Sequence, residues 1–185
     1  MEPNYAFARD MARKILKDYK LAKAPTDLSV IFKGLGLKYM ELNEADDIDG
    51  AILEIEGKPA IAVLNKARPL QRQRFTLAHE LGHIFLKHTE RDIYDSEEIR
   101  DDSGQLSEKT KPPQEIEADI FASELLIPYE QLKKYTADMN DIDKLADAFQ
   151  VSRQAMTLAI MNFWKHGGKK KTANLLLLLF LHQLL

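Results

Sequence analysis

Two histidines and a glutamate, His79, Glu80 and His83, stand at the spacing H-E-x-x-H in a stretch without proline. Residues i and i+4 of an α-helix lie on one face, about 40° apart around its axis. Two imidazoles placed in this way can bind one zinc ion, and the glutamate between them can reach a water molecule on the metal. The pattern therefore predicts a zinc-dependent hydrolase and favours a peptidase.

The residues around this pattern argue against a chance match. Most of its neighbours are large and apolar: Phe75, Leu77, Leu81, Ile84, Phe85 and Leu86. They leave little polar surface on the helix. Two imidazoles and a carboxylate on a largely buried helix are costly unless they bind something.

A third protein ligand is expected from a second helix, over residues 114–127. The chain has no cysteine, so the ligand must be a histidine, an aspartate or a glutamate. Glu115 and Asp119 share the face with small and apolar side chains, which would pack inward. We therefore expect Glu115 to complete the metal site and Asp119 to accept the outer N–H of a ligand histidine. Glu117 and Glu124 lie on the opposite face, where we expect them to be solvated.

His88 follows the pattern too closely to share its face. On a continuing helix it points away from His79 and His83, so we expect a surface histidine near the helix C-terminus. It can join them only if the helix ends first. The metzincin pattern would need a glycine at position 86 and a histidine at 89. Those positions hold Leu86 and Thr89, which excludes that class of site.

Periodicity and turn signals predict an α+β fold that is mostly helical, with a C-terminal helical hairpin. The expected elements are helices over 5–23 and 27–33, strands over 37–42, 51–56 and 59–64, the H-E-x-x-H helix over 69–87, and helices over 114–127, 129–135, 141–149 and 153–164. We expect a metallopeptidase domain over 1–136, a helix-turn-helix-like subdomain over 137–168 and an atypical Lys/Leu-rich tail over 169–185.

Composition restricts the partners of this chain. A net charge of −3 over 185 residues gives no global electrostatic case for nucleic acid. The first residues lack the basic and apolar regions of a signal peptide. The apolar run Leu175–Leu181 is shorter than the roughly 20 residues that cross a bilayer. A cytoplasmic protein with no membrane span is expected.

Two segments together resemble a known family. Residues 72–83 (RQRFTLAHELGH) and 115–128 (E-x-E-A-D-x-F-A-x-x-L-L-x-P) are similar to the ImmA/IrrE family of zinc metallopeptidases, and the similarity covers roughly residues 5–165. It implies a gluzincin-like fold, with a short three-stranded antiparallel sheet beside the H-E-x-x-H helix and a glutamate ligand at the position of Glu115. Members are bacterial or phage proteins, several of them linked to cleavage of helix-turn-helix repressors. The leucine-rich tail is no part of this pattern.

These features lead to one leading hypothesis and one alternative. The first is a cytoplasmic endopeptidase with one Zn²⁺, with Glu80 as general base and a regulatory protein, such as a helix-turn-helix repressor, as substrate. The alternative is a zinc-binding regulatory or toxin–antitoxin partner module that acts by binding protein or DNA without proteolysis. Arg153, Gln154 and Thr157 are placed to face a DNA groove. Nearby aspartates oppose DNA, which favours packing or substrate docking for this helix pair.

Three further roles stay open at this level. Tyr94, His88 or an arginine within 89–113 is a candidate to stabilise an oxyanion. The acidic segment 89–113 is a candidate lid. The strand Pro59–Leu64 is a candidate to pair with an extended substrate by strand addition.

Overall fold

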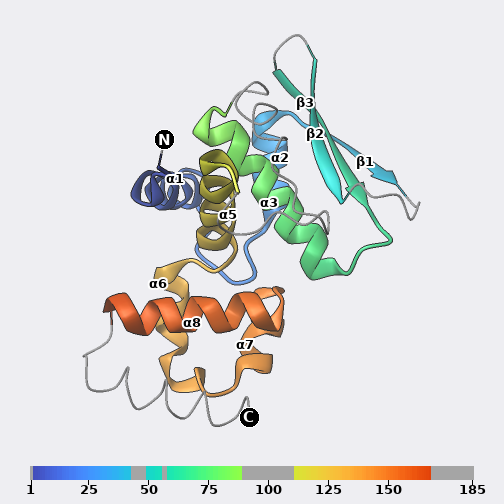
Figure 1. Ribbon diagram of the computed structural model, residues 1–185. Helices are drawn as coiled ribbons and strands as arrows, with labels where there is room; N and C mark the ends of the chain where they lie inside the picture. Colours follow the sequence, from blue (N-terminus) through green and yellow to red (C-terminus); the bar gives the residue numbers. More distant parts are fainter. Residues whose placement is uncertain (1, 43–48, 56–57, 89–110, 168–185) are drawn as a thin grey trace, which may run out of the picture.

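The computed structural model describes residues 2–42, 49–55, 58–88 and 111–167. Helix α3 (Leu70–Leu86) lies between a small sheet and helix α5 (Pro113–Leu126), and α1 (Tyr5–Asp18) packs against α5 (Figure 1). Helix α2 (Leu28–Leu35) lies behind α3 in this view. The predicted α+β class, mostly helical, is confirmed.

The sheet consists of β1 (Lys38–Leu42), β2 (Gly50–Ile55) and β3 (Lys58–Asn65), in the order β1-β3-β2. β2 and β3 form the expected antiparallel hairpin, but β1 pairs with β3 in parallel. The prediction of an antiparallel sheet is wrong in this respect, and the sheet is mixed. Parallel neighbours need a long connection, and here β2 is itself part of the connection from β1 to β3.

The strand order also changes the expected route for a substrate. β3 is the central strand, with β1 on one side and β2 on the other. Both of its edges are therefore occupied, and the predicted strand addition to Pro59–Leu64 is wrong. Of the described strands, β2 is an edge strand that also contacts α3.

The close approach of α3 and α5 depends on a glycine. A Cβ at Gly82 would lie 3.1 Å from the Cα of Ala118 and 3.2 Å from its carbonyl oxygen. Leu81, Phe121 and Leu125 are fully buried in the core that the two helices share. The missing side chain at Gly82 therefore lets polar groups of two helices come within bonding distance of one another.

The C-terminal part forms the expected helical hairpin from α7 (Ile142–Phe149) and α8 (Arg153–Gly167). It follows α6 (Tyr129–Leu132) and a 3₁₀ segment (Lys133–Asp138), and α8 packs on α6 through the stacked rings of Phe163 and Tyr129 (Figure 1). The division at residues 136 and 137 stays a prediction, and the tail over 169–185 lies outside the described residues. Among the described helices, none combines the length and apolar character required to span a bilayer.

Candidate metal centre

Three donor side chains from two helices converge between α3 and α5. The Nε2 atoms of His79 and His83, one turn apart on α3, are 3.0 Å apart. Glu115 enters from the first turn of α5, with Oε2 at 3.2 Å from His79 Nε2 and Oε1 at 3.2 Å from His83 Nε2. Among the described residues, these three form a group that can hold a metal ion.

The spacing of these atoms fits a metal of zinc's size. Donors about 2.0–2.1 Å from a tetrahedral zinc ion are separated from one another by about 3.3 Å. The two Nε2 atoms are 3.0 Å apart, and each is 3.2 Å from a different oxygen of Glu115, so all three contacts are close to this value. The three side chains are 11–19 % exposed, so the donors are sheltered from bulk water. Two imidazoles and one carboxylate are also a donor set that suits a divalent transition metal.

Asp119 lies one turn beyond Glu115 and contacts the other side of the His79 ring. His79 Nδ1 is 2.9 Å from Asp119 Oδ1, and Lys111 pairs with Oδ2 of the same carboxylate. Burial works against ionisation of Asp119, but its contacts with His79 and Lys111 lower its pKa below the ordinary value. An ionised Asp119 accepts the Nδ1–H of His79 and leaves Nε2 free to bind a cation.

Two carboxylates favour positive charge on the histidines of this cluster. Burial alone would lower the pKa of His79, but hydrogen bonds to Asp119 and Glu115, and their charges, raise it to about 9. Burial likewise opposes ionisation of Glu115, yet its hydrogen bonds to His79 and His83 hold its pKa well below the usual range. The site is thus arranged to receive positive charge.

Glu80 lies on the same helix beside the edge strand β2. Burial raises the pKa of its carboxyl group, although the charges of His79 and His83 and a backbone hydrogen bond from Ile52 act in the opposite direction. A carboxylate with a raised pKa is a better base near neutral pH than an ordinary glutamate.

His88 does not lie at the surface, contrary to the prediction. Helix α3 ends at Leu86, and Lys87 takes a left-handed conformation (φ 61°). The chain then turns back, and the imidazole of His88 lies 3.0 Å from His83, Nδ1 to Nδ1. Its side chain is only 6 % exposed. No glycine marks the end of this helix, so the turn could not be predicted from the residue types around it.

The expectation of two solvated glutamates on α5 is also wrong. The side chain of Glu117 is 15 % exposed and contacts His88, with Oε2 at 3.0 Å from Nε2. The side chain of Glu124 is 11 % exposed and pairs with Arg13 of α1. Helix α1 covers this face of α5, and a helical wheel of α5 alone cannot show it.

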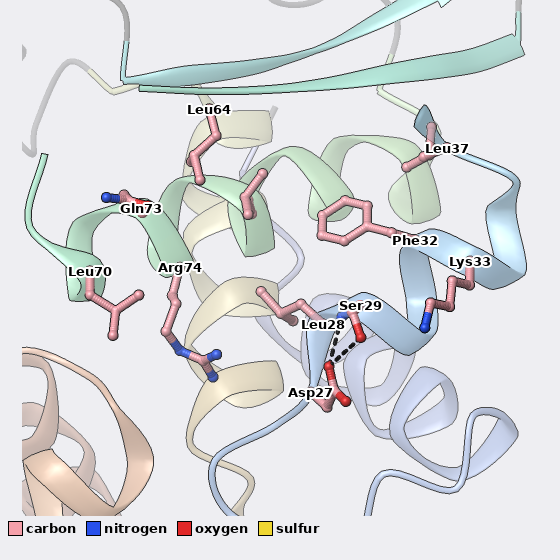
Figure 2. A pocket seen from close by; sticks show the side chains of 11 residues that line it. Asp27, Leu28, Ser29, Phe32, Lys33, Leu37, Leu64, Leu70, Gln73 and Arg74 are labelled. Atoms are coloured by element: carbon pink, nitrogen blue, oxygen red, sulfur yellow. Dashed lines mark hydrogen bonds between the residues drawn. The ribbon is translucent and has the colours of Figure 1, made fainter. Parts of the chain in front are cut away.

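A separate pocket of about 510 Å³ lies on the opposite face of α3. Leu70, Gln73, Arg74 and Leu77 line it at the helical spacing i, i+3, i+4, i+7. Figure 2 shows Gln73 and Arg74 extending from α3 toward this space, with Leu28 and Phe32 reaching it from α2. The pocket shares no residue with the His79, His83 and Glu115 group. The candidate oxyanion residue Tyr94, and the candidate lid apart from residues 111–113, lie outside the described residues.

An H-E-x-x-H helix, a glutamate from a following helix and a small sheet beside them define the architecture of a metallopeptidase-type domain. Residues 36–161 match the family model described as the IrrE N-terminal-like domain (Peptidase_M78). The chain belongs to this family, and the resemblance inferred from its two motifs is confirmed.

One solved structure of similar fold is a Mycobacterium tuberculosis transcriptional regulator. The two share 15 % sequence identity with a TM-score of 0.57, over 82 % of this chain and 45 % of that protein. At this identity the likeness concerns the fold, and this chain spans less than half of the regulator's length. Among curated proteins, no significant match was found.

Proposed function

We propose that this protein is a zinc-dependent endopeptidase, in which His79, His83 and Glu115 hold the metal and Glu80 is the general base. One observation carries the proposal: the Nε2 atoms of His79 and His83 lie 3.0 Å apart and each is 3.2 Å from one oxygen of the Glu115 carboxylate, next to the glutamate of the H-E-x-x-H sequence. A purely structural zinc site usually fills all four positions with protein side chains and needs no base beside them. Three donors leave one position for the reaction.

When bound, the zinc ion supplies Lewis acidity, which polarises a peptide carbonyl and lowers the pKa of water. Glu80 accepts the proton of the attacking water and passes it to the leaving amine. Its raised pKa suits both steps, because the carboxyl group must take up the proton and then release it. Asp119 holds His79 in the tautomer that presents Nε2 to the metal.

An extended peptide is the substrate shape that this fold favours. β2 is an edge strand, and the backbone of its residue Ile52 is hydrogen-bonded to Glu80. A peptide added along this edge would run past the general base. We propose a regulatory protein, such as a helix-turn-helix repressor, as the substrate and the cytoplasm as its location. Family membership and the transcriptional-regulator neighbour support a regulatory setting.

Replacement of Glu80 by Gln tests the enzymatic proposal directly. The wild type and Glu80→Gln would each be purified with zinc, and cleavage of a co-expressed candidate repressor would be followed by mass spectrometry. We expect Glu80→Gln to retain about one zinc ion per chain and to lose cleavage by at least 100-fold. Glu130→Gln is the matched control, because the side chain of Glu130 is 76 % exposed and belongs to α6, whereas the metal donors and Glu80 belong to α3 and α5. Cleavage that persists in Glu80→Gln would show that this residue is not the base.

The same experiment distinguishes the endopeptidase from the alternative, a zinc-binding partner module without proteolysis. A stable complex with an intact repressor, in wild type and Glu80→Gln alike, would support that alternative.

The helical hairpin of α7 and α8 offers less support for DNA contact than the sequence suggested. Arg153 is paired with Asp143 at 3.4 Å, and the hydroxyl of Thr157 donates to the backbone of Arg153.

A further inference from the structure

We propose that His88 and Glu117 are positioning residues that fix the orientation and tautomer of His83 for metal binding. The inference rests on the proposed metal site but not on proteolysis. A chain of contacts runs from His83 Nδ1 to His88 Nδ1 at 3.0 Å, and from His88 Nε2 to Glu117 Oε2 at 3.0 Å. The carboxylate of Glu117 thus acts on His83 through an intervening imidazole.

The end of α3 builds this arrangement. Lys87 adopts the left-handed conformation, and the backbone N–H of His88 donates to the carbonyl of His83 at 3.0 Å. This turn places the two rings edge to face, with centroids 5.0 Å apart. A helix that continued by one more turn would carry His88 to the other side. The backbone reversal therefore brings the ring of His88 to the side of His83 that faces away from the metal donors.

The protons of the three groups follow from the chemistry of the site. His83 must keep the lone pair of Nε2 for the metal, so its proton lies on Nδ1 and is donated to His88. His88 then accepts at Nδ1 and carries its own proton on Nε2. That proton is donated to Glu117, which as a carboxylate can only accept. In this chain of contacts each ring nitrogen either donates, accepts or is kept for the metal, and the carboxylate of Glu117 at its end determines where the protons lie.

Glu117 is itself held in place. Its Oε1 accepts the backbone N–H of Asn4 at 2.6 Å, and Asn4 caps the first turn of α1. The side chains of His88 and Glu117 are 6 % and 15 % exposed, so water competes little for these contacts. His79 has the same support in a shorter form, since Asp119 contacts it directly. Both metal-binding imidazoles are therefore oriented by carboxylates of α5.

An isosteric change at Glu117 gives the sharpest test. In Glu117→Gln the side chain has one acceptor and one donor, but Asn4 N–H and His88 Nε2–H both need acceptors. If the amide donates to His88, the protons shift along the chain, and His83 carries its proton on Nε2, where the metal must bind. We expect Glu117→Gln to weaken zinc binding by about 10–100-fold, the usual effect of losing such a partner.

Glu124→Gln is a matched control on the same helix. Glu124 is similarly buried, and its partners among the described residues are Arg13 and the backbone N–H of Tyr129, not a histidine. Zinc affinity would be measured by competition with a chromophoric chelator, and the tautomer of His83 by ¹⁵N chemical shifts in the zinc-loaded protein. We expect Glu124→Gln to bind zinc like the wild type. Circular dichroism would verify the fold of each variant.

His88→Phe is the second variant, which keeps an aromatic ring but removes the nitrogen that accepts from His83. It tests the assignment if Glu117→Gln does not fold. Zinc affinity within twofold of wild type in the folded variants, or a loaded wild type with the proton of His83 on Nε2, would overturn the assignment. Weakened affinity only in the His88 and Glu117 variants would establish it. Zinc affinity is measured without a substrate, so a failure of the peptidase proposal would appear separately, as a candidate repressor that stays intact in the presence of the wild type.

Discussion

Protons and metal should compete for the ring of His79. In the metal-free protein, hydrogen bonds to Asp119 and Glu115 outweigh burial and raise the pKa of this histidine to about 9. A metal needs the lone pair of Nε2, so binding near neutral pH must displace a proton. Below pH 9, the apparent Kd should rise about tenfold for each unit by which the pH falls, or about 100-fold from pH 8 to pH 6, counting only this proton.

The stability of the metal-free protein should depend on pH in the opposite sense. The folded pKa of His79 lies above its unfolded value of about 6.5, so protonated His79 stabilises the fold fully below pH 6.5. This contribution is lost as the pH rises through about 9, and a shift of that size corresponds to about 3 kcal/mol. Stabilisation by zinc grows over the same range because affinity increases. Loaded and metal-free protein should diverge as the pH rises.

Two measurements check this prediction. Calorimetry at pH 7 in buffers of different ionisation enthalpy counts the protons released on zinc binding, and urea unfolding with chelator gives the stability of the metal-free protein. We expect about one proton from His79 and a decline in metal-free stability between pH 7 and 9. Asp119→Asn removes a charge that raises the pKa of His79, so it should release fewer protons. Zinc binding without proton release in the wild type would refute the reasoning.

Two further predictions concern the faces of α3. Gly82→Ala should destabilise the fold by about 1–3 kcal/mol and weaken zinc binding, because the added Cβ would lie 3.1 Å from the backbone of Ala118. Urea unfolding measures the stability and chelator competition measures the zinc affinity. If neither quantity changed, the close contact of the two helices would be contradicted. Arg74→Met should cost less than about 1.5 kcal/mol, because it removes one hydrogen bond to the carbonyl of Thr26 while relieving a buried Nε that has no partner among the described residues. Zinc affinity should not change, because Arg74 lies on the pocket face of α3, and a shift of more than threefold would show that the two faces are coupled.

The periodicity of a single helix was sufficient to predict which side chains lie on the inward faces of α3 and α5. The i,i+4 spacing of His79 and His83 places their imidazoles together on any α-helix. The small side chains near Glu115 identify the side of α5 that meets α3, because only small residues allow two backbones to approach closely. The structure brings these three side chains together. Both steps depend on one helix at a time, which is why the sequence was sufficient.

The errors arose where a neighbouring element decides the outcome. β1 and β3 pair in parallel through a contact between separate parts of the chain, and nothing in either strand marks that direction. The environment of Glu124 depends on Arg13, more than one hundred residues earlier. His88 lies where it does because α3 stops at Leu86, although Lys87 is not a residue that usually ends a helix in the left-handed conformation.

Helix α5 has carboxylates on two faces because it lies between two other helices. On the side of α3, Glu115 and Asp119 contact His79. On the side of α1, Glu124 pairs with Arg13, while Glu117 joins both sides, since one oxygen accepts from Asn4 and the other contacts His88. Buried carboxylates are costly unless each has partners, so this helix is stable only with its neighbours docked. The first turn of α1 is therefore part of the support of the candidate metal centre, although it contributes no side chain to the His79, His83 and Glu115 group.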